Sequence, residues 1–337
     1  MTRSVRFLSF AYAALAVSLL VPAFAEARSA AAAPATPVLV GQCENPPRGY
    51  VYASALPVAT DRLAAPPVTA ASAAVIDGET GRILLNFDAH RRLPPASTTK
   101  ILTAALTLED GDLDRVVTSA TDARAMVGSS VMGLVPGMPI TIRDLLYGLL
   151  LPSGNDAAVE LSRAVAGDRR AFVAMMNAKV RTLGLTNTHF ENPHGLDSPG
   201  QFSSAYDLAM IARYAMSNPQ FAGMVGARVR HLPPPLDYDI ANGNTLLGAY
   251  PGADGVKVGW TEAAGWTFVA SATHGGHRVF VALMDTKDRD GDAAHLLDWA
   301  WQAFSWVDVT PGVGRALRLA SRLGIWSSAM GSLGACG

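Results

Sequence analysis

The chain has 337 residues, which is long enough for one large domain or two small ones with a sizeable hydrophobic core. Half of the residues are hydrophobic, and the net charge of −1 gives no indication that the protein binds nucleic acid. Its two cysteines are too few for a disulfide framework, so a fold held together mainly by cross-links is excluded.

The first 25 residues have the pattern of a secretory signal peptide. Arg3 and Arg6 precede an uncharged run that ends in Ala-Phe-Ala at positions 23–25, the small-residue pattern of a cleavage site. The run is nearly long enough to span a membrane, so a retained membrane anchor is the alternative. We expect an exported protein of the cell envelope whose mature chain begins near Glu26.

Residues 26–69 and 309–337 are expected to lie outside the folded domain. The first segment is rich in alanine and proline and has no amphipathic period, which indicates an extended linker. In the second segment, Arg315, Arg318 and Arg322 fall on one helical face. A basic amphipathic segment of this kind can associate with an anionic membrane, and a frayed tail is the alternative.

The periodicity of the remaining residues, 70–308, predicts a single folded domain. A β-hairpin at 73–86 precedes two prolines, and a helix then begins near Ser97. A mostly helical middle part and an antiparallel meander with a closing helix follow. The helices are expected at 156–166, 170–183, 205–216 and 293–304, and the strands of the meander at 255–261, 266–273 and 278–285. This order predicts an α+β fold: an antiparallel β-sheet with helices on both faces plus an all-helical subregion.

A serine and a lysine at the start of the first predicted helix form a candidate catalytic pair. Ser97 and Lys100 are three residues apart, so their side chains lie on one helix face. A serine hydroxyl needs a base, and a lysine can act as one only if burial or a second cation lowers its pKa. Lys257 is a candidate for that cation. A helix cap and an exposed lysine are the alternative interpretation of the pair.

Two further segments carry candidate binding groups. Ser153 and Asn155 lie where an apolar segment breaks into a polar loop; Ser153 can relay a proton and Asn155 can hold a substrate amide, although such a sequence is also a common turn. On the strand at 255–261, the alternation of side chains places Lys257, Gly259 and Thr261 on one face. Trp260 directly follows the glycine. Gly259 allows close approach of a ligand, and the N–H of Trp260 can pair with that of Ser97 as an oxyanion hole.

Together these segments resemble the low-molecular-mass penicillin-binding proteins that act as serine D-alanyl-D-alanine carboxypeptidases. The resemblance covers about residues 70–306 and rests on the strings PASTTK, LPSGNDAA, ENPHGLD and GADGVK, which begin at positions 95, 151, 191 and 252. It implies that Ser97 forms an acyl-enzyme with Lys100 as base and Ser153 as proton relay, and that Lys257 binds a terminal carboxylate. It also implies a peptidoglycan stem peptide ending in D-Ala-D-Ala as substrate, β-lactams as inhibitors, and no metal or organic cofactor.

The chain departs from this family at Val258, where a threonine or serine is usual. A hydrogen bond to a charged group is worth roughly 1.5–3 kcal/mol, which valine cannot supply; Thr261 is the candidate substitute. An endopeptidase of the same family and a non-hydrolytic peptidoglycan-binding protein remain alternatives. A β-lactamase is less favoured, since no Glu-x-x-Leu-Asn string follows Ser153. The acidic cluster at 288–292 fits a helix N-cap better than a calcium loop.

Overall fold

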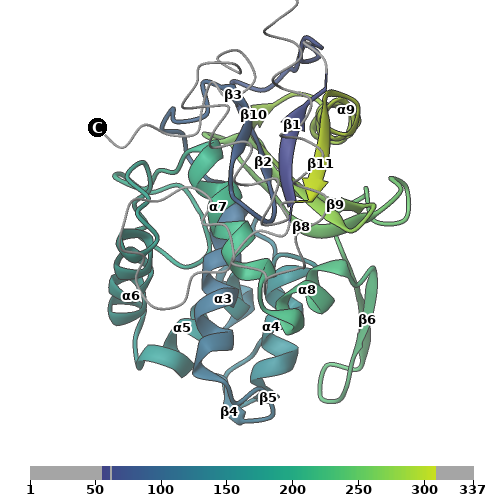
Figure 1. Cartoon of the computed structure of the whole chain (residues 1–337). Helices are drawn as coiled ribbons and strands as arrows, with labels where there is room; N and C mark the ends of the chain where they lie inside the picture. The colour runs from purple at the N-terminus through teal and green to yellow at the C-terminus, as the bar shows by residue number, and fades with distance from the viewer. Residues whose placement is uncertain (1–54, 61–62, 309–337) are drawn as a thin grey trace, which may run out of the picture. The chain divides into compact units, whose positions relative to one another are not determined.

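The computed structural model of the chain describes residues 55–60 and 63–308 (Figure 1). Residues 57–306 form one compact unit, and the other unit, residues 1–56 and 307–337, falls almost wholly outside the described residues. The expected signal peptide and the expected basic tail both lie outside them. Within the described ranges, none of the helices is both long and apolar enough to cross a membrane.

A five-stranded antiparallel sheet forms the centre of this unit, with the strand order β3-β2-β10-β9-β8. Its strands are β2 (Ser72–Asp77), β3 (Ile83–Phe87), β8 (Ala253–Thr261), β9 (Gly265–His274) and β10 (His277–Thr286). The predicted hairpin and the predicted meander are therefore confirmed. The strand β8, which carries the predicted binding residues, is an edge strand of the sheet, so one of its sides has no strand neighbour there.

Helices cover both faces of the sheet, as the predicted fold class requires (Figure 1). On one face lie α3 (Lys100–Asp110), α4 (Ile142–Leu150), α5 (Asn155–Ala166), α6 (Arg169–Thr182), α7 (Ala205–Met216) and α8 (Pro219–Gly226). The helix α9 (Arg289–Ala303) packs on the other face. The predicted helices at 156–166, 170–183 and 205–216 are thus present, with boundaries that differ by no more than one residue.

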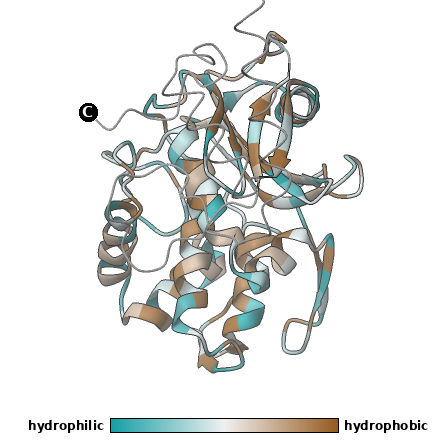
Figure 2. Ribbon diagram, viewed as in Figure 1, coloured by the Kyte–Doolittle hydropathy of each residue, from teal (hydrophilic) through white to brown (hydrophobic). Residues whose placement is uncertain are grey.

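The alternation of side chains along β2 explains why two layers of helices are needed. All six residues of this strand are buried. Ala74 and Ile76 belong to the core under the helical subregion, whereas Ala73 and Val75 belong to the core under α9. Figure 2 shows hydrophobic residues along the sheet and along the helices packed on it. Burial of both faces fixes the strand register, because a slip of one residue would exchange the two cores.

Short polar side chains define several helix starts. Thr141, Ser204 and Asp288 accept hydrogen bonds from backbone N–H groups in the first turns of α4, α7 and α9. Asp288 accepts from the N–H of Gly291 at 3.0 Å, so the interpretation of the acidic cluster as an N-cap is confirmed. Asp292 in the same cluster accepts from the backbone N–H and the hydroxyl of Thr69.

The prediction of an extended linker over residues 26–69 was wrong near its carboxyl end. Residues Ala55–Ala59 form strand β1, which pairs with strand β11 (Phe304–Asp308) in a two-stranded sheet. Thr60 continues this contact, since its N–H donates to the carbonyl of Ala303 at 2.9 Å. The closing helix α9 begins at Arg289, four residues before its predicted start, and ends at Ala303, one residue before its predicted end. The proline and alanines of β1 gave no strand signal, and its pairing depends on a partner at the other end of the domain.

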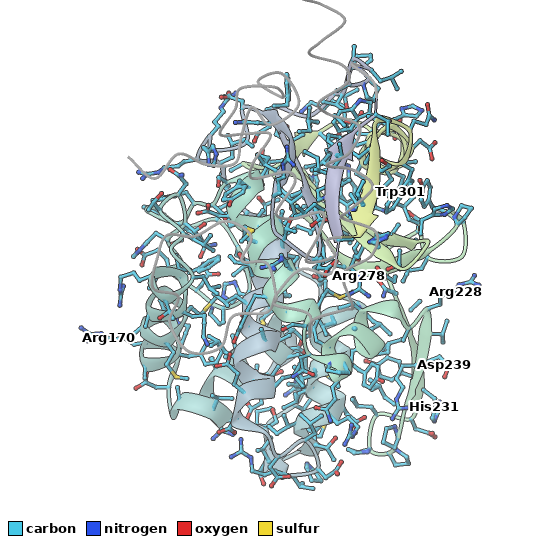
Figure 3. The ribbon with its side chains drawn as sticks, in the orientation of Figure 1. Arg170, Arg228, His231, Asp239, Arg278 and Trp301 are labelled. Carbon is cyan, nitrogen blue, oxygen red and sulfur yellow. The ribbon has the colours of Figure 1, made fainter. Side chains whose placement is uncertain are left out.

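Two ribbons and one short turn were also not predicted. The strands β4 (Val116–Thr118) and β5 (Pro139–Thr141) pair with each other, as do β6 (Val229–Leu232) and β7 (Tyr238–Ala241). His231 and Asp239 face each other across the second ribbon, with 2.9 Å between Nδ1 and Oδ1 (Figure 3). The helix expected to begin near Ser97 starts as a 3₁₀ turn, η1 (Ala96–Thr99), and becomes α-helical at Lys100.

Candidate active site

Ser97 lies in η1, which is fastened to the sheet at its amino end. The hydroxyls of Thr267 on β9 and of Thr98 both donate to the carbonyl of Pro95, at 3.0 and 2.6 Å. The α-helix α3 then begins at Lys100, and the three-residue spacing brings the two predicted side chains together. Lys100 Nζ lies 2.8 Å from Ser97 Oγ, within hydrogen-bond distance.

The Lys100 side chain is completely buried, and its contacts come from three parts of the fold. Besides Ser97, Nζ contacts Asn155 Oδ1 at 2.6 Å and the carbonyl of His194 at 2.7 Å. Asn155 is the first residue of α5, whereas His194 belongs to the loop before α7. The amine is therefore held in one position, directed at the serine hydroxyl.

The surroundings of Lys100 favour its neutral form. Burial lowers its pKa well below the usual lysine value, and the positive charge of Lys257 lowers it further, against a smaller opposite effect of the Asp156 carboxylate. The prediction that Lys257 is the second cation is consistent with this arrangement. A neutral amine 2.8 Å from a hydroxyl can accept its proton, which is what nucleophilic attack by Ser97 requires.

The loop that carries Ser153 and Asn155 is fixed by backbone hydrogen bonds. The N–H of Gly154 donates to the carbonyl of Gly148 at 2.8 Å, and the N–H of Asn155 donates to that of Ser130 at 2.8 Å. Ser153 itself has a φ of 71°, in the left-handed region that non-glycine residues rarely adopt. These bonds fix the backbone of the two residues that follow Ser153, including Asn155, whose side chain contacts Lys100.

Asp156 is a positioning residue that sequence reasoning missed. Its carboxylate is completely buried and accepts hydrogen bonds from the backbone N–H groups of Met132, Gly133 and Leu134, at 2.9, 2.9 and 3.0 Å. These bonds fasten the segment before β5 against the start of α5, directly after Asn155. The only signal in the sequence was an acidic residue at a helix start immediately after Ser-Gly-Asn.

Gly259 brings strand β8 against the nucleophile. A Cβ atom built on Gly259 would lie 2.7 Å from the backbone nitrogen of Ser97 and 2.5 Å from Thr267 Oγ1, closer than real Cβ contacts. The position therefore requires glycine, and the backbone of β8 passes next to the Ser97 amide. Trp260 follows with 56% of its surface exposed and with its ring beside that of Trp266.

Two basic residues, Lys257 on β8 and Arg289 on α9, are close enough for their charges to interact. Lys257 is buried, and its burial together with the positive charge of Arg289 lowers its pKa to about 7. The Arg289 guanidinium lies over the ring of Trp266, at 4.6 Å from the centroid, and donates to the carbonyl of Gly243 at 3.3 Å. Sequence reasoning missed Arg289, because only the packing of α9 on the sheet brings it near Lys257.

The structure does not support Thr261 as a substitute for the hydroxyl missing at Val258. The Thr261 hydroxyl donates to Asp197 Oδ1 at 2.8 Å and accepts from the N–H of Ala264 at 3.1 Å, so its proton is already used. The Val258 side chain belongs to the opposite face of β8, the α9 side, and lies against Gly243. The two side chains are thus on different faces of the strand.

The backbone carbonyl of His194 contacts Lys100, and the imidazole ring of His194 is neutral. Its burial, reinforced by the charges of Lys100 and Arg169, lowers the pKa of the imidazole to about 3. The ring Nδ1 accepts from the N–H of Leu196 at 3.2 Å, while the backbone carbonyl accepts from Lys100. We therefore assign His194 to holding the loop and the Lys100 amine rather than to proton transfer.

A family model described as D-alanyl-D-alanine carboxypeptidase matches residues 59–288, more than half of the chain. The chain belongs to this family. Family membership and the antiparallel sheet between two layers of helices agree with the resemblance seen in the sequence. The matched range contains every predicted site residue from Ser97 to Thr261.

Curated relatives of the D-alanyl-D-alanine carboxypeptidase family support the assignment. DacB2 of Mycobacterium tuberculosis is 42% identical over 237 residues, which cover 67% of this chain and 80% of that protein. DacF of Bacillus subtilis is 35% identical over 244 residues, 70% of this chain. The chain spans 63% of the length of the B. subtilis relative.

Solved structures show the same fold. A D-alanyl-D-alanine carboxypeptidase from Mycobacterium tuberculosis H37Rv matches with a TM-score of 0.69 and 38% identity, over 75% of this chain and 98% of that one. The Streptomyces K15 DD-transpeptidase matches with a TM-score of 0.67 and 30% identity, over 71% of this chain and all of that one. The predicted fold class is confirmed by these structures.

Proposed function

We propose that the protein is an exported serine D-alanyl-D-alanine carboxypeptidase that trims peptidoglycan stem peptides through an acyl-enzyme on Ser97. The observation that carries this proposal is the buried Lys100 amine, held 2.8 Å from Ser97 Oγ with a lowered pKa. A plain helix cap with an exposed lysine would have neither property. The curated relatives DacF and DacB2 are named as D-alanyl-D-alanine carboxypeptidases, which supports the same reaction.

In the proposed mechanism, neutral Lys100 takes the proton of Ser97 Oγ, and the oxygen attacks the carbonyl carbon of the penultimate D-alanine. The N–H groups of Ser97 and Trp260 hold the resulting oxyanion. Ser153 passes the proton from Lys100 to the leaving amine, the C–N bond breaks, and free D-alanine departs. Water then cleaves the ester, which returns the proton to Ser97 and releases the shortened peptide.

Two basic residues, Lys257 on β8 and Arg289 on α9, suit a substrate with a free carboxyl terminus. Lys257 carries a positive charge below about pH 7, and the positive charge of Arg289, which itself pairs with Asp290 at 3.3 Å, opposes it; a terminal carboxylate beside Lys257 would offset this repulsion. Asn155 uses its Oδ1 on Lys100, so its amide N–H₂ group remains the part that can donate to a substrate carbonyl. The carboxylate of a β-lactam would bind in the same way.

Labelled penicillin, combined with a D-alanine release assay, tests this function. We expect stable labelling, a single adduct on the peptide that contains Ser97, and release of D-alanine from a pentapeptide. Fast release of the label would instead indicate a β-lactamase. Labelling with cleavage of cross-linked peptides only would indicate an endopeptidase, and absence of labelling a peptidoglycan-binding protein. An adduct that persists in Ser97→Ala would contradict the assignment of the nucleophile.

The pH dependence of kcat/KM should reflect two lysines with opposite requirements. Lys100 must be neutral, so activity rises as pH increases through its lowered pKa, whereas Lys257 must be charged to bind a carboxylate. Because the pKa of Lys257 is lowered to about 7, its positive charge is present below that pH and is lost above it. We therefore expect kcat/KM for D-alanine release to fall above about pH 7.

The Lys257→Arg variant serves as the comparison for this profile. An arginine stays charged over the whole range, so the decline above about pH 7 should disappear while the rise at lower pH remains. A profile in which the alkaline decline persists unchanged in Lys257→Arg would show that another group causes it.

A hydroxyl at position 258 should improve substrate binding. The Val258 side chain is partly exposed and lies on the α9 face of β8, but β8 is an edge strand, so a hydroxyl at this position can reach a carboxylate bound along the open edge beside Lys257. A threonine has a similar shape, so the fold should tolerate the change. One added hydrogen bond to a carboxylate is worth roughly 1.5–3 kcal/mol, so Val258→Thr is expected to raise kcat/KM for D-alanine release about tenfold or more. Val258→Ala is the control for a change in packing alone. Unchanged or lower activity in a folded Val258→Thr protein would contradict this expectation.

We propose export on the basis of the N-terminal arginines, the apolar run and the Ala-Phe-Ala sequence, which lie outside the described residues. N-terminal sequencing of the protein from the envelope fraction is expected to begin near Glu26. A sequence that begins at Met1 would support a retained anchor. Release of the protein by truncation at residue 309 would test the proposed association of the basic tail with the membrane.

A further inference from the structure

The loop between β7 and β8, residues 242–252, contacts the site but has no part in the mechanism above. Its contacts begin at Gly243, whose N–H donates to the carbonyl of Leu151 at 3.2 Å. A Cβ atom built on Gly243 would lie 3.1 Å from Val258 Cγ2, so this glycine also lies against β8. The loop therefore touches both the strand of the site and the segment that leads to Ser153.

The first two residues of α9, Arg289 and Asp290, meet this loop at Thr245. The Thr245 hydroxyl donates to Asp290 Oδ2 at 2.5 Å, and the same oxygen accepts from Arg289 Nη2 at 3.4 Å. Arg289 Nε in turn lies 3.3 Å from Asp290 Oδ1. The three side chains thus close a ring of contacts in which the hydroxyl is both donor and acceptor, and this ring fixes the direction of the guanidinium.

The ring of contacts leaves one nitrogen of the Arg289 guanidinium without a partner. Nη2 donates to Thr245 and to the carbonyl of Gly243, at 3.4 and 3.3 Å, and Nε lies beside Asp290. The ring of Trp266 lies against the guanidinium at 4.6 Å and restricts it further. Among the residues that the structure describes, Nη1 has no hydrogen-bond acceptor. Its two N–H groups are therefore available to an acceptor from outside the protein.

We propose that Thr245 is a positioning residue that, together with Asp290, holds the Arg289 guanidinium where its Nη1 donates to the free carboxylate of the leaving D-alanine. The proposal rests on the proposed function, which supplies a substrate with a free carboxyl terminus. The guanidinium is within reach of β8, because Gly243 accepts from Arg289 and also lies against Val258. Since valine has no hydroxyl to offer, a guanidinium held in one direction supplies the donor that this position lacks.

Removal of the Thr245 hydroxyl tests the proposal. Thr245 is exposed, so Thr245→Val opens the ring of contacts without leaving a cavity in the core. We expect KM for D-alanine release from a pentapeptide to rise about three- to tenfold, the usual net effect of one hydrogen bond, with kcat unchanged because the carboxylate is bound before and during the reaction. Thr245→Ser keeps the hydroxyl and should keep the original KM. In Arg289→Gln, which has lost the guanidinium, Thr245→Val should have no further effect.

Thr182→Val is the matched control, because this exposed threonine at the end of α6 donates to the carbonyl of Ala178 in its own helix. Its KM should be unchanged. An unchanged KM in Thr245→Val, a raised KM in Thr245→Ser, a loss in kcat alone, or a full effect of Thr245→Val in Arg289→Gln would overturn the proposal. Penicillin labelling separates the two hypotheses: a protein labelled on Ser97 without the Thr245 effect disproves only the positioning role, whereas an unlabelled protein refutes the carboxypeptidase assignment itself.

Discussion

A Lys100→Arg variant is expected to lose acylation by penicillin by a factor of at least about one hundred, the low end of the effect of removing a general base. An arginine guanidinium keeps its proton in proteins, so it cannot accept the proton of Ser97. The buried site that lowers the pKa of lysine would instead hold a permanent charge. The rate of adduct formation, followed by intact mass, measures the loss.

The control for this change is Lys179→Arg on α6, where the lysine is near the surface and pairs with Glu109 at 2.8 Å. That variant should acylate at the normal rate. Thermal unfolding of both proteins would show whether the larger guanidinium at position 100 is accommodated. Acylation of a folded Lys100→Arg protein at a rate close to normal would remove Lys100 from the role of base.

Gly259→Ala should reduce the acylation rate by roughly 10²–10³, the usual cost of losing one donor of an oxyanion hole. The added Cβ would lie 2.7 Å from the Ser97 nitrogen, so β8 and η1 would have to move apart. It would also meet Thr267 Oγ1, the group that fastens η1 through the carbonyl of Pro95. Both displacements move the N–H groups away from the position of the oxyanion.

Gly223→Ala in α8 is the matched control, because a Cβ at Gly223 meets no atom within 4 Å and alanine favours a helix. It should leave the acylation rate unchanged. Circular dichroism of both variants separates a displaced site from an unfolded protein. If folded Gly259→Ala acylates as fast as the unmodified chain, the proposed oxyanion hole is misplaced.

Local patterns in the sequence predicted most of the fold. The helices at 156–166 and 205–216 and the meander at 255–285 have clear periodicity and short turns, so neighbouring residues were sufficient to define them. Strand β1 was missed because Pro57 and its alanines are weak strand formers, and its partner β11 is almost 250 residues away in the chain. Its stability comes from tertiary pairing.

In the candidate active site, too, local sequence patterns predicted some features, whereas others depend on tertiary contacts. The spacing of Ser97 and Lys100 was visible in the sequence, and so was the alternation that places Lys257 and Gly259 on one face of β8. The contribution of Arg289 depends on how α9 packs, and the use of the Thr261 hydroxyl depends on a loop more than 60 residues away. Such relations arise only when elements from different parts of the chain meet.

The burial of Lys100 and Lys257 also has a consequence for folding thermodynamics. Both amines have a lower pKa in the folded protein than in the unfolded chain, so the unfolded chain binds more protons between about pH 7 and the usual lysine pKa of 10.5. The free energy of unfolding therefore rises with pH across this interval, and it is lowest where the pH is below the folded-state pKa values and both buried amines must carry charge. The groups that make the serine reactive thus reduce the stability of the free enzyme near neutral pH, and a bound carboxylate would restore part of it.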